Sequence, residues 1–312
     1  MPLKIAVVGV GKIARDQHLP VIAASPDFEL VATASRSAGV EGVRSFPSLA
    51  ELLDACPEVQ AVSLCTPPAV RAGDARLAMA RGVHVLLEKP PAATLSAVDE
   101  LARRAEAAGV TLFASWHSRF APRVTEAADW LSTRQVRAVR IVWKEDVRVW
   151  HPGQEWIFAA GGMGVFDPGI NALSIVTRIL SEPFSLTRAR LTFPANRQAP
   201  SAAELAFEVA QGAQIAAEFD FLHPGEPCWD IDVATDDGRL LLSKGGAELS
   251  IEGAAAPGAA SADPAHPEYA PLYAHFARLI SEGRSDVDVA PLRHVADAFM
   301  LGERIEGPPF SF

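Results

Sequence analysis

The sequence contains few of the features that cross-link a chain or place it in a membrane. Its 312 residues include three cysteines, Cys56, Cys65 and Cys228, which are too few and too scattered for a disulfide framework or a zinc site. No window approaches the roughly 18 consecutive apolar residues that a membrane span needs. The initial stretch MPLKIAVVGVGKIA lacks the small-residue cleavage site of a secretory signal. These absences predict a cytoplasmic protein without a membrane partner.

The sequence also has no strongly basic segment. Its 28 Lys and Arg residues against 38 Asp and Glu residues give a formal net charge of -10, which repels nucleic-acid phosphates and anionic membranes. We therefore expect no nucleic-acid partner. With 49% hydrophobic and 21% charged residues the composition is that of an ordinary globular protein. Because domains usually have about 100 to 200 residues, we predict two, at residues 1–120 and 121–312.

A glycine motif follows the first strand-like run. The segment KIAVVGVGKIA passes from β-branched residues to Gly9 and Gly11 and then to a helical pattern that begins near Lys12. In this setting a G-x-G-x-x-A motif, here ending at Ala14, is typical of a dinucleotide site, because the glycines allow a tight turn and a close approach to the pyrophosphate. A glycine-rich turn without a ligand is the alternative. The predicted cofactor contacts are Gly9, Gly11, Lys12 and Ile13.

The end of the next predicted strand, residues 29–36, indicates which cofactor binds. An NAD site usually presents an Asp or Glu there to the ribose 2′-hydroxyl, whereas a nearby arginine accommodates the 2′-phosphate of NADP. Here the strand ends in Ser35 and Arg36, without an acid. The sequence therefore favours NADP, or both NADP and NAD, with Ser35 and Arg36 as contacts. Arg36 as a solvated surface charge is the alternative.

Further apolar runs predict strands at residues 61–66, 84–88 and 111–115, separated by Ala-rich helical stretches that end in glycine. This alternation is typical of a doubly wound parallel (Rossmann) sheet, whose ligands bind at the carboxyl ends of the strands. Lys89 lies at that edge. Because Pro90 follows it, its backbone is restricted to an extended conformation, which favours a held, functional side chain over a surface lysine.

Three motifs together resemble one family. The Gly9-x-Gly11-x-x-Ala14 turn, Thr66-Pro67-Pro68 and Glu88-Lys89-Pro90 resemble the glucose-fructose oxidoreductase, inositol dehydrogenase and rhizopine-catabolism (Gfo/Idh/MocA) oxidoreductases, and with the second half the match covers essentially the whole chain. The resemblance implies that Thr66, Pro67, Glu88 and Lys89 also contact the cofactor. It further implies a homodimer or homotetramer formed through the open face of the second-domain sheet.

Beyond residue 120 the pattern changes to hairpins. Residues 203–222 read as one hairpin and residues 229–243 as a second, with alternating apolar and polar positions. Residues 136–150 are also strand-like. This pattern predicts an α+β domain for substrate binding and oligomerisation, built on an open, mostly antiparallel sheet. Residues 254–268 are Ala/Pro-rich and predict an exposed, mobile loop. The last helical pattern, residues 291–304, fits either domain, and the resemblance favours the first.

The segment GGMGVFDPGIN, residues 161–171, carries the strongest signal of the second half. Asp167 followed by Pro168 reads as a helix N-cap with proline at the first helical position, and Asn171 lies four residues on, on the same helix face. A merely capped helix is the alternative. The segment resembles a family element whose final histidine commonly serves as general base. Asn171 replaces that histidine, and an amide cannot accept a proton near neutral pH.

Proton transfer must then fall to another group, and Asp167 and Lys89 are the candidates. We predict that Asp167 accepts the hydroxyl proton, that Lys89 orients and polarises the oxygen, and that Asn171 holds a neighbouring hydroxyl. The predicted catalytic residues are Lys89, Asp167 and Asn171.

Aromatic and polar residues cluster in the run WKEDVRVWHPGQEW, residues 143–156. Aromatic faces beside hydrogen-bonding groups suit a sugar, which offers apolar C–H faces and a rim of hydroxyls, although core packing explains tryptophans equally well. The predicted substrate contacts are His117, Glu145, Trp150, His151, Asp167, Asn171 and Trp229. The spacing of the acids and histidines matches no metal-ligand template, so no metal is predicted.

This run and the segment GVFDPGINALSIVTRIL resemble the aldose 1-dehydrogenases within the family, which share the Asn in place of His. The resemblance implies NAD(P)-dependent oxidation of C1 of a cyclic aldose of the L-arabinose, D-galactose or D-fucose type to the lactone. Two alternatives stay open. The chain is another oxidoreductase of the family, acting on an inositol, an imine or a non-sugar carbonyl, or it is a non-catalytic sugar-sensing regulator.

Overall fold

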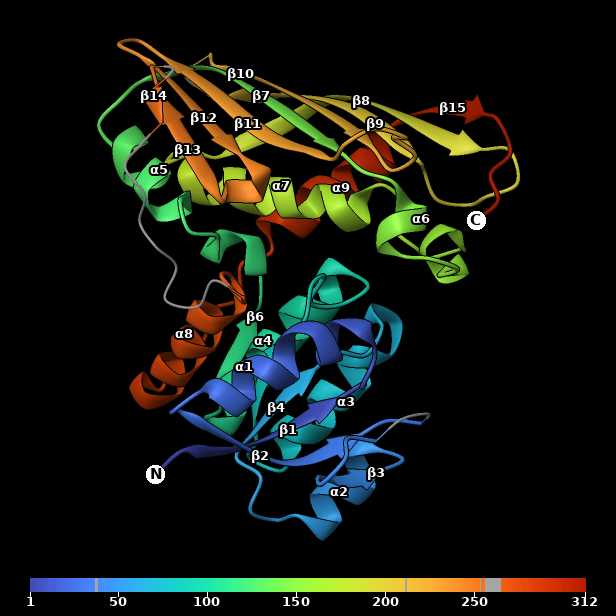
Figure 1. Cartoon of the computed structure of the whole chain (residues 1–312), viewed down its shortest axis with the longest axis vertical. Helices are drawn as coiled ribbons and strands as arrows, with labels where there is room; N and C mark the ends of the chain where they lie inside the picture. The colour runs from blue at the N-terminus through green and yellow to red at the C-terminus, as the bar shows by residue number, and fades with distance from the viewer. Residues whose placement is uncertain (37–38, 211, 253, 256–264) are drawn as a thin grey trace. The chain divides into compact units, whose positions relative to one another are not determined.

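The computed structural model describes residues 1–36, 39–210, 212–252, 254–255 and 265–312 (Figure 1). Most of the predicted loop at residues 254–268 therefore lies outside the described residues. The chain divides into two units. The first comprises Met1–Phe120 and a later segment that contains helix α8 and ends at Val289, and the second contains the intervening residues and Ala290–Phe312.

The first unit is built on a six-stranded sheet in the order β3-β2-β1-β4-β5-β6, with all neighbours parallel. Its strands are β1 (Leu3–Val8), β2 (Phe28–Ala34), β3 (Arg44–Phe46), β4 (Ala61–Leu64), β5 (His84–Leu87) and β6 (Leu112–Ala114). Its helices are η1 (Ala14–His18), α1 (Leu19–Ala24), α2 (Leu49–Ala55), α3 (Pro68–Ala80), α4 (Leu95–Ala108), η2 (His117–Phe120) and α8 (Tyr269–Glu282). The strand order reverses between β1 and β4, which is where doubly wound sheets bind ligands.

Successive residues of β1 point into two separate cores. Ala6 and Val8 pack with α2, α3 and α4 on one face of the sheet, and Ile5 and Val7 pack with α1 and α8 on the other. Because both faces are covered, the strands are apolar throughout, as the sequence predicted. The three-residue strand β3 was not predicted, since it is too short to show a period.

Helix α8 belongs to the first unit, although it lies in the range 121–312 that was expected to form the second domain. Its apolar stripe, which includes Leu272, Tyr273, Phe276 and Leu279, is buried in the core of the first unit. The last helix, α9 (Ala290–Leu301), instead packs on α7 and β8 of the second unit. It ends before Gly302, and the following residues, predicted as helix up to Arg304, begin strand β15.

The second unit is built on a nine-stranded sheet in the order β14-β13-β12-β11-β7-β10-β9-β8-β15. Its strands are β7 (Val136–Lys144), β8 (Phe184–Pro194), β9 (Ala202–Val209), β10 (Gln214–Asp220), β11 (Cys228–Thr235), β12 (Arg239–Ser243), β13 (Glu248–Ile251), β14 (Ala254–Ala255) and β15 (Glu303–Gly307). Only the pairs β7/β10 and β8/β15 are parallel among its described strands. Both predicted hairpins form, as β9/β10 and β11/β12.

Helices α7 and α9 cover one face of this sheet. The helices of this unit are α5 (Val124–Leu131), α6 (Val147–Trp150), η3 (Glu155–Phe158), α7 (Phe166–Ile179), η4 (Lys244–Gly246) and α9. Figure 1 shows α7 and α9 lying across that face. Gly169 of α7 allows the close approach, because a Cβ there would lie 2.7 Å from the ring of Phe219 in β10. Residues 147–150, expected in a strand, form α6 because the side chain of Asp146 accepts a hydrogen bond from Arg148 N at 2.9 Å.

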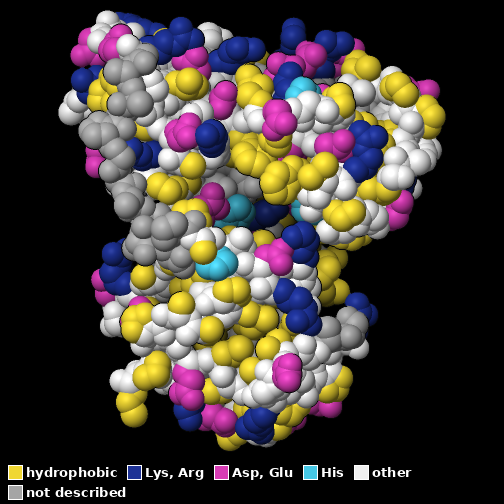
Figure 2. All heavy atoms as spheres, viewed as in Figure 1, with side chains coloured by type: hydrophobic (Ala, Val, Ile, Leu, Met, Phe, Trp, Pro, Cys, Tyr) yellow, Lys and Arg dark blue, Asp and Glu magenta, His cyan; other side chains and the backbone are white. Residues whose placement is uncertain are grey.

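The surface carries charges of both signs. On the face drawn in Figure 2, Lys and Arg side chains lie among Asp and Glu side chains. Within the first unit, Arg44 pairs with Glu58 at 3.3 Å and Arg81 pairs with Asp54 at 2.8 Å. No helix among the described residues has both the length and the apolar character to span a membrane.

Candidate active site

The turn after β1 has the geometry of a cofactor loop. Gly9 has φ +88°, and a Cβ there would lie 2.8 Å from the backbone N of Thr66, so this turn touches the loop that follows β4. A Cβ at Gly11, by contrast, would meet no atom of the protein within 4 Å. The fold itself therefore does not require glycine at position 11, whereas close approach of a pyrophosphate does. The residues present fit a dinucleotide.

The remaining predicted contacts of this turn lie on a helix that differs from the expected one. A π-helical turn, η1, precedes α1, and the helix is not regular from Lys12 onward. Lys12 pairs with Asp16 one turn along, and Ile13 is exposed. At the end of β2, Ser35 donates its backbone N–H to Phe46 O at 2.9 Å, and the Arg36 side chain is exposed.

Glu88 anchors the loop that carries Lys89. Glu88 is 3% exposed, and its Oε2 accepts the backbone N–H of Lys89 at 2.7 Å. Glu88 Oε1 accepts from Tyr269 Oη at 2.6 Å and lies 3.1 Å from His18 Nε2. Lys89 itself is half-buried, and the Lys89–Pro90 peptide bond is cis. The buried carboxylate therefore fixes the backbone of the predicted catalytic lysine.

His18 and Glu88 form a buried ion pair. Burial alone raises the pKa of Glu88, but the hydrogen bond and charge of His18, with smaller effects of His117 and Tyr269, hold that pKa well below its ordinary value. Burial alone lowers the pKa of His18, but interactions with the Cys65 thiol, the neighbouring phenol and Glu88 outweigh it and raise that pKa well above 6.5. Both shifts favour the charged forms of the two groups.

Two tyrosines of α8 complete this network. Tyr273 Oη lies 2.7 Å from His18 Nδ1 and 2.7 Å from Ser63 Oγ of β4. The pKa of Tyr269 is raised well above its ordinary value by burial and by the Glu88 charge, so its hydroxyl remains a donor. The sequence analysis missed His18, Tyr269 and Tyr273, because contacts across such long separations leave no local pattern.

His117 lies in the same region of the first unit. Its ring stacks on that of Tyr269, with centroids 5.3 Å apart, and its Nδ1 pairs with the Glu268 carboxylate. The sequence predicted His117 as a substrate contact. In the structure His117 is half-buried and lies beside the Glu88 network.

In the second unit the structure brings two predicted residues, His151 and Asp167, together. His151 Nε2 lies 3.4 Å from Asp167 Oδ2, and Asp167 is 5% exposed. The prediction that Asp167 caps its helix is wrong. Helix α7 begins at Phe166, and the cap residue is Val165, because Gly164 turns the chain with φ +54° one residue earlier. Asp167 thus lies in the first turn, and the half-buried Asn171 follows on the next turn of the same helix.

A second group in this unit joins Glu145, Trp150 and Trp229. Glu145 is buried, and its Oε2 accepts a hydrogen bond from Trp229 Nε1 at 2.8 Å. The rings of Trp150 and Trp229 lie 5.4 Å apart between centroids, and Trp150 remains 41% exposed. A buried carboxylate thus fixes one indole, while the neighbouring indole presents a face to solvent.

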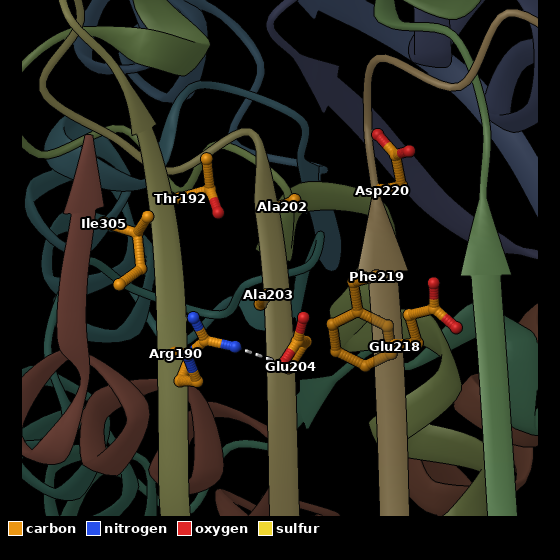
Figure 3. Close-up of a pocket in the computed structure, with 9 residues that line it drawn as sticks. All are labelled: Arg190, Thr192, Ala202, Ala203, Glu204, Glu218, Phe219, Asp220 and Ile305. Carbon is orange, nitrogen blue, oxygen red and sulfur yellow. Dashed lines mark hydrogen bonds and ion pairs between the residues drawn. The ribbon is translucent and has the colours of Figure 1, made fainter. Parts of the chain in front are cut away.

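A shallow pocket of about 120 Å³ lies on the opposite, uncovered face of the nine-stranded sheet (Figure 3). Its lining includes Arg190, Thr192, Glu204 and Asp220, and none of its residues is among the predicted site residues. Among the described residues, no group of three or more His, Cys, Asp or Glu side chains is arranged to hold a metal ion.

Comparisons with known proteins identify the family. Residues 3–115 match the GFO_IDH_MocA model, described as an oxidoreductase family with an NAD-binding Rossmann fold. Galactose 1-dehydrogenase of Pseudomonas fluorescens is 45% identical over 309 residues, which cover 99% of each chain. The chain belongs to the Gfo/Idh/MocA oxidoreductase family. The predicted family, the class of fold and the nicotinamide cofactor are thus confirmed.

Two solved structures resemble the chain over nearly its whole length. The crystal structure of a D-galactose-1-dehydrogenase protein from Rhizobium etli has 54% identity and a TM-score of 0.94, with 99% of this chain and 98% of that one covered. A 3-ketoreductase from Actinomadura kijaniata in complex with NADP and TDP-benzene has a TM-score of 0.85 at 20% identity, covering 99% and 100%. The second likeness, at this low identity, shows a shared fold alone.

Proposed function

We propose that the chain is an NAD(P)-dependent aldose 1-dehydrogenase that oxidises C1 of a cyclic sugar to the lactone. The observation that carries the proposal is the full-length similarity to galactose 1-dehydrogenase, 45% over 99% of both chains. The sugar is of the L-arabinose, D-galactose or D-fucose type. NADP is the favoured acceptor because Ser35 and Arg36 end β2 without an acid, and NAD is accepted as well.

The chain's own residues orient the sugar and remove a proton, while the bound nicotinamide supplies the hydride acceptor. Asp167 accepts the proton of the C1 hydroxyl through its carboxylate. Lys89 orients and polarises that oxygen. The buried Glu88 carboxylate supports this role of Lys89, because Glu88 Oε2 accepts the Lys89 backbone N–H at 2.7 Å and so fixes that backbone. His151 Nε2 lies 3.4 Å from Asp167 Oδ2 and so helps to hold that carboxylate in place.

The second group of side chains binds the sugar ring. Trp150 offers an exposed aromatic face to the apolar C–H face of a pyranose, and Trp229, held by Glu145, supports it. Asn171 and His151 supply hydrogen bonds to neighbouring hydroxyls, and His117 is a further proposed substrate contact. An aromatic platform with a polar rim is the arrangement that sugar sites use.

The assay is direct. Purified protein is mixed with NADP or NAD and one of L-arabinose, D-galactose and D-fucose, and reduced cofactor is followed at its nicotinamide absorbance. We expect reduction with at least one sugar and the lactone as product. No reduction with any of the three, combined with turnover of an inositol or an imine, would contradict the proposed substrate class and favour another reaction of the family.

Two further features belong to the proposal. Copies of the chain assemble as a homodimer or homotetramer through the uncovered face of the nine-stranded sheet, and the enzyme works in the cytoplasm. The uncovered face carries arginines and glutamates side by side, such as Arg190 and Glu204 at 3.1 Å, so two copies of it can be complementary.

A further inference from the structure

Arg71 is a buried cation that binds backbone carbonyls at the ligand edge of the six-stranded sheet. Arg71 lies in α3 and is 3% exposed, and its Nε donates to Thr66 O at 3.0 Å. One terminal nitrogen also donates to Thr66 O, and the other donates to both Glu88 O and Pro90 O. Thr66 follows β4, whereas Glu88 and Pro90 flank Lys89 after β5.

The residue type matters for this arrangement. A guanidinium is planar and presents several N–H donors in fixed directions, so one side chain can bind carbonyls of two loops at once. A lysine ammonium carries the same charge, but it is a compact point charge on a flexible stem and cannot reproduce that geometry. Burial of the cation is tolerated because the carbonyl oxygens replace its lost water.

The two loops joined by Arg71 belong to one half of the cofactor site. In a doubly wound sheet of this order, the dinucleotide lies across the switch between β1 and β4. The glycine turn and Ser35–Arg36 follow β1 and β2, on the adenosine side. The loops after β4 and β5, which Arg71 connects, therefore lie on the nicotinamide side, and one of them carries Lys89.

We propose that Arg71 is a positioning residue for the nicotinamide half of the site. By tying the Thr66 loop to the Glu88–Pro90 loop, it holds the Lys89 backbone where the lysine must act. The role in turnover rests on the proposed function, but the role in cofactor binding does not. The proposal therefore predicts a selective loss of affinity for the whole cofactor, and none for its adenosine part.

The test compares two substitutions on the same helix. Arg71→Lys keeps the charge and removes the bridge, and Arg76→Lys is the matched control, because Arg76 is partly exposed and pairs with Glu100 at 3.0 Å on the surface. Affinity for NADPH is measured by nicotinamide fluorescence, and affinity for 2′-phospho-ADP-ribose, which lacks the nicotinamide, by calorimetry. If NADH is the tighter ligand of the unmodified protein, NADH and ADP-ribose are used instead.

We expect Arg71→Lys to weaken NADPH binding about tenfold and to lower kcat roughly 100-fold, the scale of a misplacement of about 1 Å in a positioned group. Binding of 2′-phospho-ADP-ribose should change less than about twofold, and Arg76→Lys should change nothing. The binding measurements need no sugar, so they test Arg71 even if the sugar assays fail.

Equal weakening of both ligands would show a general structural role and overturn the proposal, as would unchanged NADPH affinity in Arg71→Lys. If Arg71→Lys does not fold, as judged by circular dichroism, Arg71→Gln is used, since its amide retains donors for one of the two loops. The same selective loss is then expected, and its absence overturns the proposal.

Discussion

Asp167 is the residue on which the proposed proton transfer depends. Asp167 is almost fully buried, and its carboxylate adjoins His151. Such burial is unusual for an aspartate whose role is only to stabilise the start of a helix. An asparagine has the same shape but cannot accept a proton. We expect Asp167→Asn to lower kcat by about 100- to 10,000-fold while NADPH affinity stays unchanged.

The measurement is the pH dependence of kcat/KM, with Asp129→Asn as control, since Asp129 is an exposed acid of the same unit. Retention of the wild-type pH profile by Asp167→Asn would show that another group is the base. Lys89 is then the remaining candidate.

For single residues, the sequence predicted which side chains belong to the candidate site better than it predicted their local geometry. The Asp167-Pro168 pair predicted that Asp167 is the N-cap. The helix begins one residue earlier, at Phe166. Before it, Gly164 approaches Pro200 so closely that a Cβ there would lie 2.1 Å from Pro200 O. The pairing of Glu145 with Trp229 could not be foreseen, because Glu145 follows β7 whereas Trp229 lies in β11, 84 residues further along the chain. The assigned roles of all these residues remain predictions.

Among the elements, α8 contributes to the first unit although it lies late in the chain. It enters the first unit from the far end of the sequence and supplies Tyr269 and Tyr273 to the His18–Glu88 pair. That pair joins η1, the end of β5 and α8 in one buried contact. An ion pair buried this deeply is costly to break from one side, because the partner charge is left uncompensated.

The pH dependence of stability follows from the two pKa shifts. The pKa of Glu88 is depressed in the folded state, so its contribution is present above its ordinary value of 4.5 and is lost as the pH falls through the folded pKa. The pKa of His18 is raised, so its contribution is complete below 6.5 and is lost as the pH rises through the folded pKa. Both stabilising contributions are therefore fully present between about pH 4.5 and pH 6.5.

We therefore expect Glu88→Gln to lower the free energy of unfolding by about 3 to 5 kcal/mol near pH 5.5, and by less toward either extreme. Urea unfolding of the full chain between pH 4 and pH 8 measures this. The control is Glu58→Gln, which removes a partly exposed pair with Arg44 and should cost less than about 1 kcal/mol. A loss that is constant across the range would contradict the buried ion pair.

Element prediction succeeded where a period was visible. The alternation of Ile215, Ala217 and Phe219 placed β10 correctly, with these residues buried and their neighbours outward. The domain to which α8 belongs was not predictable, since its apolar stripe fits any uncovered sheet face. Short elements such as β3 and α6 were missed because three or four residues cannot show a period.

For the whole molecule, the uncovered face of the nine-stranded sheet is the surface that remains to be explained. Ala206 and Ala216 face each other across β9 and β10 on that side, and Arg188, Arg190, Glu204 and Glu218 surround them. Small residues ringed by charges of both signs make a flat surface that a second copy can meet in a two-fold arrangement. This is the face that the family resemblance predicted for assembly.

Ala216→Arg places a long cation in the middle of this face, where a partner would have to accommodate it. We expect the substitution to convert the proposed homodimer or homotetramer into a smaller species, measured by light scattering after size-exclusion chromatography. Ala107→Arg, on the exposed side of α4 in the first unit, is the matched control and should leave the mass unchanged. A monomeric wild-type protein, or an Ala216→Arg variant with the wild-type mass, would exclude this face as the contact. Because the substituted side chain points away from α7 and Asp167, a change in mass with unchanged thermal stability would locate the effect at the interface.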